Sequence, residues 1–153
     1  MANIVRYDRR PDLEPIQMSN GLTSVFIAVL ALAASRLART NHEKELAAWI
    51  GSRDQSVFGL GVVGFNIGEI PWAAETLDQD KAFLLRAIQA AEARTGWDGL
   101  DYVPGEDSLT PSLDKFGELV AAFCAEDIVR TQERSWPWGK PETLTLCEKH
   151  GVY

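Results

Sequence analysis

The sequence predicts an all-α fold: a single helical domain of about five helices that covers residues 1–153. Three observations support this prediction. Several segments carry apolar residues at helical spacing behind residues that cap helix starts. Strand-like alternation is confined to the two ends of the chain, and the middle is a nearly uncharged, glycine-rich run around which the helices are expected to pack. A chain of 153 residues is long enough to bury a core without disulfide bonds.

The first forty residues predict an extended arm followed by a central helix. Residues 1–19 are expected to form the arm, in which residues 3–7 alternate weakly as a strand would. Ser19 or Asn20 can cap the helix that follows. Its side chains are apolar on nearly every face, which indicates a position inside the core. The run is too short and too interrupted by polar residues to predict a membrane span.

A capping box predicts the second helix. The hydroxyl of Thr40 and the carboxylate of Glu43 can each accept a hydrogen bond from an unpaired amide at the helix start. We expect this helix to run from about His42 to Ile50 and to end at Gly51. Because His42 falls in the first helical turn, its imidazole is expected to face solvent.

The third helix has a similar start signal. Thr76 and Gln79 repeat the spacing of a capping box, and apolar residues then recur at helical spacing until Gly96. Asp78 and Asp80 lie in the first turns of this helix. There we expect their negative charges to complement the positive end of the helix dipole.

A proline predicts where the fourth helix begins. Thr110 can cap the helix, and Pro111 fits its first position because the amide that proline lacks would be unpaired there in any case. An apolar stripe follows and includes Cys124, which we expect to pack as a small hydrophobic residue. The helix is expected to continue through residues 128–133.

The C-terminal segment predicts an extended strap. Two tryptophans and two prolines fall within residues 136–141, and this composition excludes a helix. We expect residues 134–153 to wrap over the bundle, with the tryptophans holding the strap in place. Residues 143–146 alternate weakly and could pair with residues 3–7 in a small terminal sheet.

The central run from Val57 to Trp72 is expected to be buried, because it contains four glycines and only one charged residue. Its glycines would let another helix approach closely while its large apolar side chains fill the core. The run includes a Gly-x-Gly-x-x-Gly pattern beginning at Gly59. That pattern seats a dinucleotide only between a strand and a helix, and this context is missing, so no cofactor is predicted.

Glu69, the single charge of this run, is the candidate catalytic residue. A carboxylate among apolar residues must be paired, exposed or shifted in pKa, and carboxylates with shifted pKa values act as general acids or bases. The interpretation we favour is structural. Glu69 would pair with Arg36 or Arg53, or would cap a helix that begins near Trp72.

The two cysteines of the chain, Cys124 and Cys147, are too few for a disulfide framework, so we expect a reducing cytoplasmic location. Cys147 and His150 have the spacing of metal ligands, and Cys124 and His42 could complete a set of four. Only one close pair exists, however. No metal site is therefore predicted, and Cys147 and His150 stay candidate ligands only.

The charge distribution bears on the partner. The net charge is −7, and residues 98–127 hold eight acids and one base, Lys115. Such a surface repels phosphate groups, so neither nucleic acid nor an anionic membrane is expected to bind. It would attract a basic protein and accelerate the encounter. Plain solubility is the alternative explanation of the same charge.

Aromatic residues lie beside some of these acids, in the loop expected after the third helix. Large rigid rings supply contact area in protein interfaces, while neighbouring charges steer the partner. The candidate partner-binding residues are Trp97, Asp98, Asp101, Tyr102, Glu106 and Asp107.

A short domain with capped helices, an acidic second half and aromatic residues beside the acids resembles the small bacterial immunity proteins, which neutralise secreted nucleases or other toxins. This resemblance covers the whole chain and rests on its overall character. It implies that the acids of the candidate residues mimic phosphate and occupy the basic cleft of a toxin. The terminal run Cys147–Gly151 departs from the pattern.

The leading hypothesis is an acidic cytoplasmic binding protein of the immunity type that masks a basic, toxin-like partner. One alternative is a small hydrolase or metal-dependent enzyme that uses Glu69 or the pair Cys147 and His150. Another is a structural domain that forms a homodimer through its tryptophan-rich strap.

Overall fold

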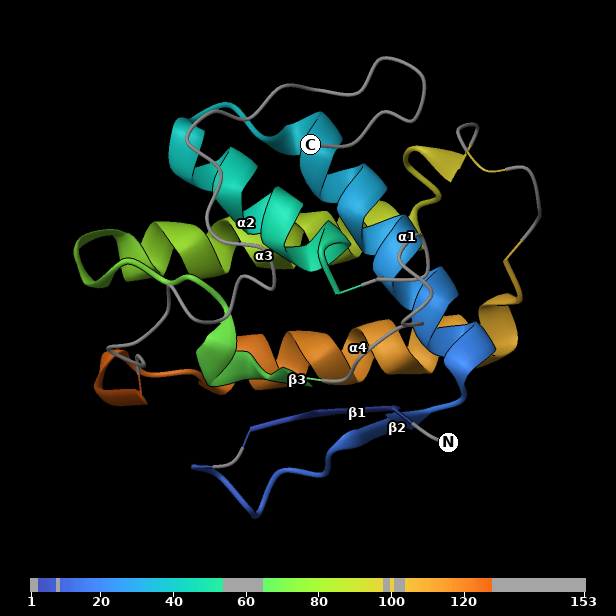
Figure 1. The fold of residues 1–153 in the computed structure, drawn as a ribbon, viewed down its shortest axis with the longest axis horizontal. Coiled ribbons are helices and arrows are strands. Elements are labelled where there is room, and N and C mark those ends of the chain that lie inside the picture. Colours follow the sequence, from blue (N-terminus) through green and yellow to red (C-terminus); the bar gives the residue numbers. More distant parts are fainter. Residues whose placement is uncertain (1–2, 8, 54–64, 98–99, 101–103, 128–153) are drawn as a thin grey trace.

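The structure is a computed structural model that describes residues 3–7, 9–53, 65–97, 100 and 104–127. This part of the chain is broadly helical, with four α-helices and a small three-stranded sheet (Figure 1). The prediction of a broadly helical fold is therefore confirmed, whereas the expected count of about five helices is not, and the sheet has three strands where at most a small terminal pair was expected. The elements are β1 (Asn3–Arg6), β2 (Ile16–Met18), α1 (Asn20–Leu37), α2 (Asn41–Gly51), β3 (Phe65–Asn66), α3 (Leu77–Glu92) and α4 (Glu106–Ala122).

Helix α1 lies at the centre of the fold, as its apolar composition predicts. It packs against α2, α3 and α4, and α3 also packs against α4 (Figure 1). Phe26, Val29 and Leu30 of α1 are completely buried. No helix among the described residues is apolar enough over a sufficient length to cross a membrane.

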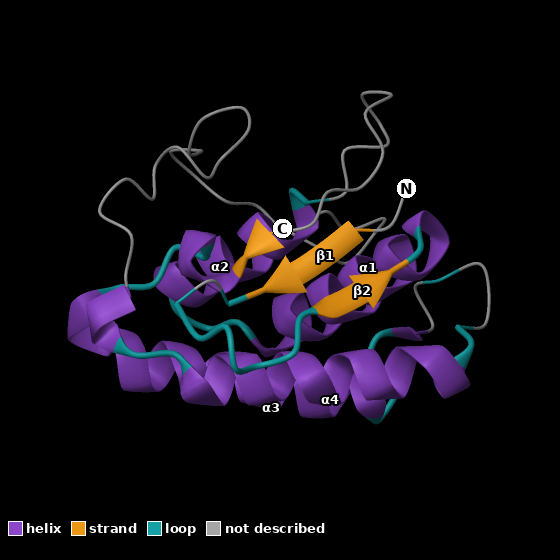
Figure 2. Ribbon diagram, turned by 90° about the horizontal axis from the view of Figure 1, so that it is seen from below, coloured by secondary structure: helices purple, strands orange, loops and turns teal. Residues whose placement is uncertain are grey.

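The sheet lies on one side of the helices and has the strand order β2-β1-β3 (Figure 2). Strand β1 is antiparallel to β2 and parallel to β3, so that Val5 is paired with both Ile16 and Phe65. The N-terminal arm is thus two paired strands joined by a turn. The expected partner of β1, residues 143–146, lies outside the described residues.

Two helix starts follow their capping signals. The Ser19 hydroxyl accepts a hydrogen bond from the amide of Leu22 at 3.2 Å, which caps α1. At α2 the Thr40 hydroxyl accepts from the Glu43 amide, and the Glu43 carboxylate accepts from the Thr40 amide, both at 3.1 Å. Both capping predictions are confirmed, because each depends only on residues within one turn.

Helix α3 begins near Thr76, but the predicted capping box with Gln79 is wrong. The Thr76 hydroxyl instead donates a hydrogen bond to the Asp80 carboxylate at 3.1 Å. The helix also ends at Glu92 rather than near Gly96. Gly96 has a φ of +85° and lies against α1, where a Cβ would be 3.1 Å from the Cβ of Leu32. A glycine is therefore required where the chain leaves α3.

The predicted start of the fourth helix, at Thr110 and Pro111, is also wrong. Helix α4 begins at Glu106, and Pro111 lies inside it. The physical reason is packing, because the earlier start places Leu109 in the core, where its side chain is only 1% exposed. The helix ends at Ala122, and residues 128–133, the expected extension, lie outside the described residues.

The C-terminal end of α4 is held by a lysine from α3. The Nζ of Lys81 donates to the backbone oxygens of Ala121 and Phe123, at 2.9 and 2.8 Å. A cation at a helix C-terminus stabilises its unpaired carbonyl groups. Cys124 follows the helix and is exposed, so the expectation that it packs on an apolar face is wrong.

Only the second half of the central run is described. Residues 54–64, with three of its glycines, lie outside the described part, as does the tryptophan-rich strap of residues 134–153. The described half is buried as expected. Phe65 contacts the rings of Trp49 and Phe116 edge to face, and Trp72 stacks on Phe123 with ring centroids 4.6 Å apart.

Candidate functional site

Glu69, the candidate catalytic residue, makes structural contacts. Its carboxylate accepts a hydrogen bond from the Asn66 amide at 3.1 Å, and the Asn66 side chain accepts one from the Gly68 amide at 3.4 Å. Together they cap the short 3-10 helix η2 (Ile67–Glu69). Burial lowers the pKa of Arg53, and attraction to Glu69 opposes that effect. These contacts fit the structural interpretation of Glu69, with η2 as the capped helix.

The predicted partner-binding residues are only partly described. Trp97 packs against the core with its indole Nε1 buried, and the Arg94 guanidinium lies 5.6 Å from the centre of its ring. Glu106 is the first residue of α4, and Asp107 beside it is exposed. The other candidates, Asp98, Asp101 and Tyr102, lie outside the described residues.

The candidate metal ligands Cys147 and His150 also lie outside the described part of the chain. Within that part, no group of three or more His, Cys, Asp or Glu side chains could hold a metal ion.

The solvent side of α4 carries an exposed row of acids. Asp107, Asp114 and Glu118 are all exposed, and their separations of seven and four residues place them on one helix face. Lys115, the one base that the sequence places among residues 98–127, lies 3.5 Å from Glu14 in an ion pair. We call Asp107, Asp114, Glu118 and the neighbouring Glu92 of α3 the acidic face.

Two carboxyl groups of the acidic face lie against each other. Glu92 and Asp114 share a hydrogen bond, which is the main cause that raises the pKa of Glu92 to about 7, with burial adding to the effect. The Oε1 atom of Glu92 is buried and has no hydrogen-bond partner among the described residues. No ion pair in this part of the structure links either group to a cation. Near neutral pH the pair therefore carries, on average, fewer than two full negative charges.

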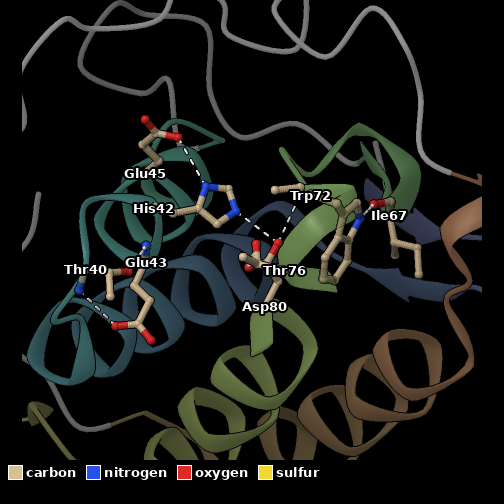
Figure 3. Close-up of polar contacts among 9 residues, drawn as sticks. Thr40, His42, Glu43, Glu45, Ile67, Trp72, Thr76 and Asp80 are labelled. Carbon is tan, nitrogen blue, oxygen red and sulfur yellow. Dashed lines mark hydrogen bonds and ion pairs between the residues drawn. The ribbon is translucent and has the colours of Figure 1, made fainter. Parts of the chain in front are cut away.

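A second polar cluster joins α2 to α3, and sequence reasoning missed it (Figure 3). The imidazole of His42 lies between two carboxylates, with Nε2 2.9 Å from Oδ2 of Asp80 and Nδ1 3.4 Å from Oε2 of Glu45. Asp80 is only 3% exposed, and it also accepts hydrogen bonds from the Ala73 amide and the Thr76 hydroxyl, at 2.9 and 3.1 Å. We call His42, Glu45 and Asp80 the histidine cluster.

The geometry of the histidine cluster favours the imidazolium ion. Each ring nitrogen faces a carboxylate oxygen, and only the protonated ring can donate from both nitrogens. The hydrogen bond to Asp80 is the main cause that raises the pKa of His42, with burial opposing it and Glu45 adding to it. Because both nitrogens are engaged, neither has a lone pair available for base catalysis. The cluster as it stands holds two helices together.

A surface pocket of about 450 Å³ lies beside the histidine cluster. Arg86 lines it with its side chain 61% exposed, and its Nη2 is 3.7 Å from Oε2 of Glu43. The Glu43 carboxylate is already bonded to backbone amides at the start of α2. The lining residues are Thr40, His42, Glu43, Thr76, Gln79, Asp80, Ala82 and Arg86.

The expectations for His42 and Asp80 are therefore wrong in a consistent way. His42 is partly buried and bonded, although its place in a first helical turn suggested solvent. Asp80 is buried in a polar junction, although it was expected only to complement the helix dipole. One signal could have located it. Asp80 precedes Phe83 by three positions and Leu84 by four, which places it on the apolar stripe of α3.

Comparison of the chain with protein-family models, curated proteins and solved structures finds no match. The resemblance to immunity proteins therefore stays a prediction.

Proposed function

We propose that this protein binds a basic protein partner through the acidic face, as an immunity-type inhibitor of a toxin-like protein would. The observation that carries the proposal is the carboxyl pair of Glu92 and Asp114 beside the exposed acids of α4. No cation among the described residues pairs with these two carboxyl groups, so near neutral and at higher pH the ionisation of one opposes that of the other and costs the folded protein stability. A lysine or arginine of a partner would supply the cation that the described residues do not provide here, and would allow both groups to ionise.

The exposed acids support the same partner chemistry. Asp107, Asp114 and Glu118 lie along one side of α4, and Lys115 of the same helix is engaged with Glu14. A row of like charges raises the local concentration of a basic partner and orients its approach. Asp98, Asp101 and Tyr102, which lie outside the described residues, and Glu106, the first residue of α4, stay candidate contact residues under the same proposal.

Binding of this kind depends on salt, which provides the test. The proposal predicts that a gene beside the one for this chain encodes the basic partner. We would co-express the two proteins, purify the complex at low salt, and measure its dissociation constant as the salt concentration rises. The double variant Asp114→Asn/Glu118→Gln is expected to weaken binding about tenfold. Glu75→Gln is the control for loss of a surface charge, because this exposed acid lies in the 3-10 turn Ala74–Thr76 that precedes α3, at the far end of that helix from Glu92.

Two results would count against the proposal. The first is the absence of any complex at low salt. The second is equal weakening of binding by the control variant, which would show that the acidic face affects binding only through the net charge of the protein. The competing prediction of a homodimer is tested by light scattering of the purified chain. A homodimer would show twice the mass of one chain in the absence of any partner.

The enzyme alternative gains no support from the described residues. Glu69 holds a backbone amide, while Cys147 and His150 lie outside the described part of the chain. A cytoplasmic location, inferred from the two cysteines, belongs to the same proposal.

A further inference from the structure

The histidine cluster connects elements that are distant in sequence. His42 lies in the first turn of α2, and Asp80 lies in α3, 38 positions away. Nε2 of His42 and the amide of Ala73 both contact the same atom, Oδ2 of Asp80, each at 2.9 Å. Through this one carboxylate the start of α2 is joined to the segment that leads into α3 (Figure 3).

The strength of this junction depends on a single proton. A neutral imidazole has one N–H and therefore donates to Asp80 or to Glu45, but not to both. When the proton leaves, one carboxylate faces a ring lone pair, and the buried Asp80 loses its cationic neighbour. The other charged groups that line the pocket are Arg86, 61% exposed, and Glu43, whose carboxylate lies 3.7 Å from that arginine.

We propose that His42 is a proton-controlled clasp, which fastens the start of α2 to residues 73–76 and α3 while its ring is protonated and loosens them when the proton is lost. The folded protein holds this proton more tightly than the unfolded chain does. The stabilisation is therefore complete below the ordinary histidine pKa of about 6.5 and is lost as the pH rises through the higher pKa of the folded state.

The first test is a titration of His42 by NMR. The chain has only two histidines, so in the variant His150→Gln the only histidine ring signals are those of His42. We expect its pKa to lie above 6.5, and we expect Asp80→Asn to lower it more than Glu45→Gln does. The Glu45 side chain is 25% exposed, so Glu45→Gln is expected to disturb the fold less than Asp80→Asn does. If Asp80→Asn fails to fold, a lowered His42 pKa in Glu45→Gln still tests the proposal. A His42 pKa at or below 6.5 would overturn the proposal.

The second test follows the junction itself by hydrogen exchange of the Ala73 amide. Each unit by which the pKa of His42 exceeds its ordinary value should reduce the protection of this amide about tenfold as the proton is lost, after correction for the intrinsic exchange rate. The amide of Asn66 is the control, because it is also held by a carboxylate, that of Glu69, at 3.1 Å.

The variant His42→Gln separates the clasp from general effects of pH. Glutamine donates a hydrogen bond but does not titrate, so the protection of Ala73 should lose its pH dependence in this variant. If Ala73 and Asn66 respond to pH alike, or if His42→Gln leaves the response of Ala73 unchanged, then His42 does not control the junction.

Discussion

Asp80 contacts His42 through a 2.9 Å interaction between Oδ2 and Nε2, and this contact joins two helices whose sequence gives little sign of it. Asp80 is 3% exposed and has three described donors: the ring of His42, the amide of Ala73 and the hydroxyl of Thr76. A buried carboxylate with this set of partners stabilises the junction only while the set is complete.

Replacing Asp80 with alanine is therefore expected to lower the free energy of unfolding by about 3 kcal/mol, because it leaves a partly buried amide and a partly buried imidazolium without their acceptor. Urea denaturation at neutral pH measures the change. Asp78→Ala is the matched control, since Asp78 lies in the first turn of the same helix but is exposed. Its loss should cost about 0.5 kcal/mol from the dipole interaction alone. Equal effects of the two substitutions would show that the buried junction contributes nothing of its own.

In the carboxyl pair of the acidic face, by contrast, a substitution is expected to stabilise the protein at high pH. The pKa of Glu92 is raised to about 7 from an ordinary value of 4.5. Between these two pH values the folded protein holds a proton on Glu92 that the unfolded chain releases. This contribution is complete below pH 4.5 and is lost as the pH rises toward 7. Asp114→Asn removes the second carboxylate, and we expect it to lower the pKa of Glu92 and to raise the stability at pH 8 relative to that at pH 5.

The carbon-13 chemical shift of the Glu92 carboxyl group reports its pKa directly, and unfolding curves at the two pH values report the stability. Glu118→Gln is the control, because it removes an exposed acid from the same face of α4. A Glu92 pKa that stays the same in Asp114→Asn would contradict the pairing.

Gly96 supplies a prediction about the fold. Its φ of +85° disfavours any larger residue, and a Cβ at this position would lie only 3.1 Å from the Cβ of Leu32. Gly96→Ala is expected to cost about 2 kcal/mol in unfolding free energy. Gly105→Ala is the comparison, since a Cβ there meets nothing within 4 Å. Similar thermal stabilities of the two variants would show that the chain can leave α3 by another path.

The features that sequence reasoning predicts correctly are local ones. Ser19 and Thr40 cap their helices through hydrogen bonds to amides three residues away, and neighbouring residues suffice to recognise them. The apolar surface of α1 likewise indicates a central helix, because the residues that cover it must come from other elements.

The features that it misses depend on distant contacts. Val5 has partners at Ile16 and Phe65, and weak alternation in the chain does not identify such pairings. Helix α4 includes Pro111 because burial of Leu109 favours a longer helix over the local preference of proline. The histidine cluster belongs to this class as well. The position of Asp80 on an apolar stripe indicates a buried carboxylate, but nothing in the local sequence identifies His42 as its partner.

The acidic face combines both kinds of information. The spacing of Asp114 and Glu118 places them on one side of a helix, so sequence alone could have grouped them. The approach of Glu92 to Asp114 depends on the packing of α3 against α4 and could not be read from either helix.

The central claim, that the acidic face binds a basic protein, is tested most directly by mapping the bound surface with backbone amide chemical shifts. The isotope-labelled chain would be titrated at low salt with the basic partner that we expect to be encoded beside its gene. The account predicts shift changes concentrated at Asp107, Asp114 and Glu118, together with a fall in the pKa of Glu92 on binding. Changes concentrated instead around the pocket lined by Thr40 and Gln79, or no change at the acidic face, would contradict it.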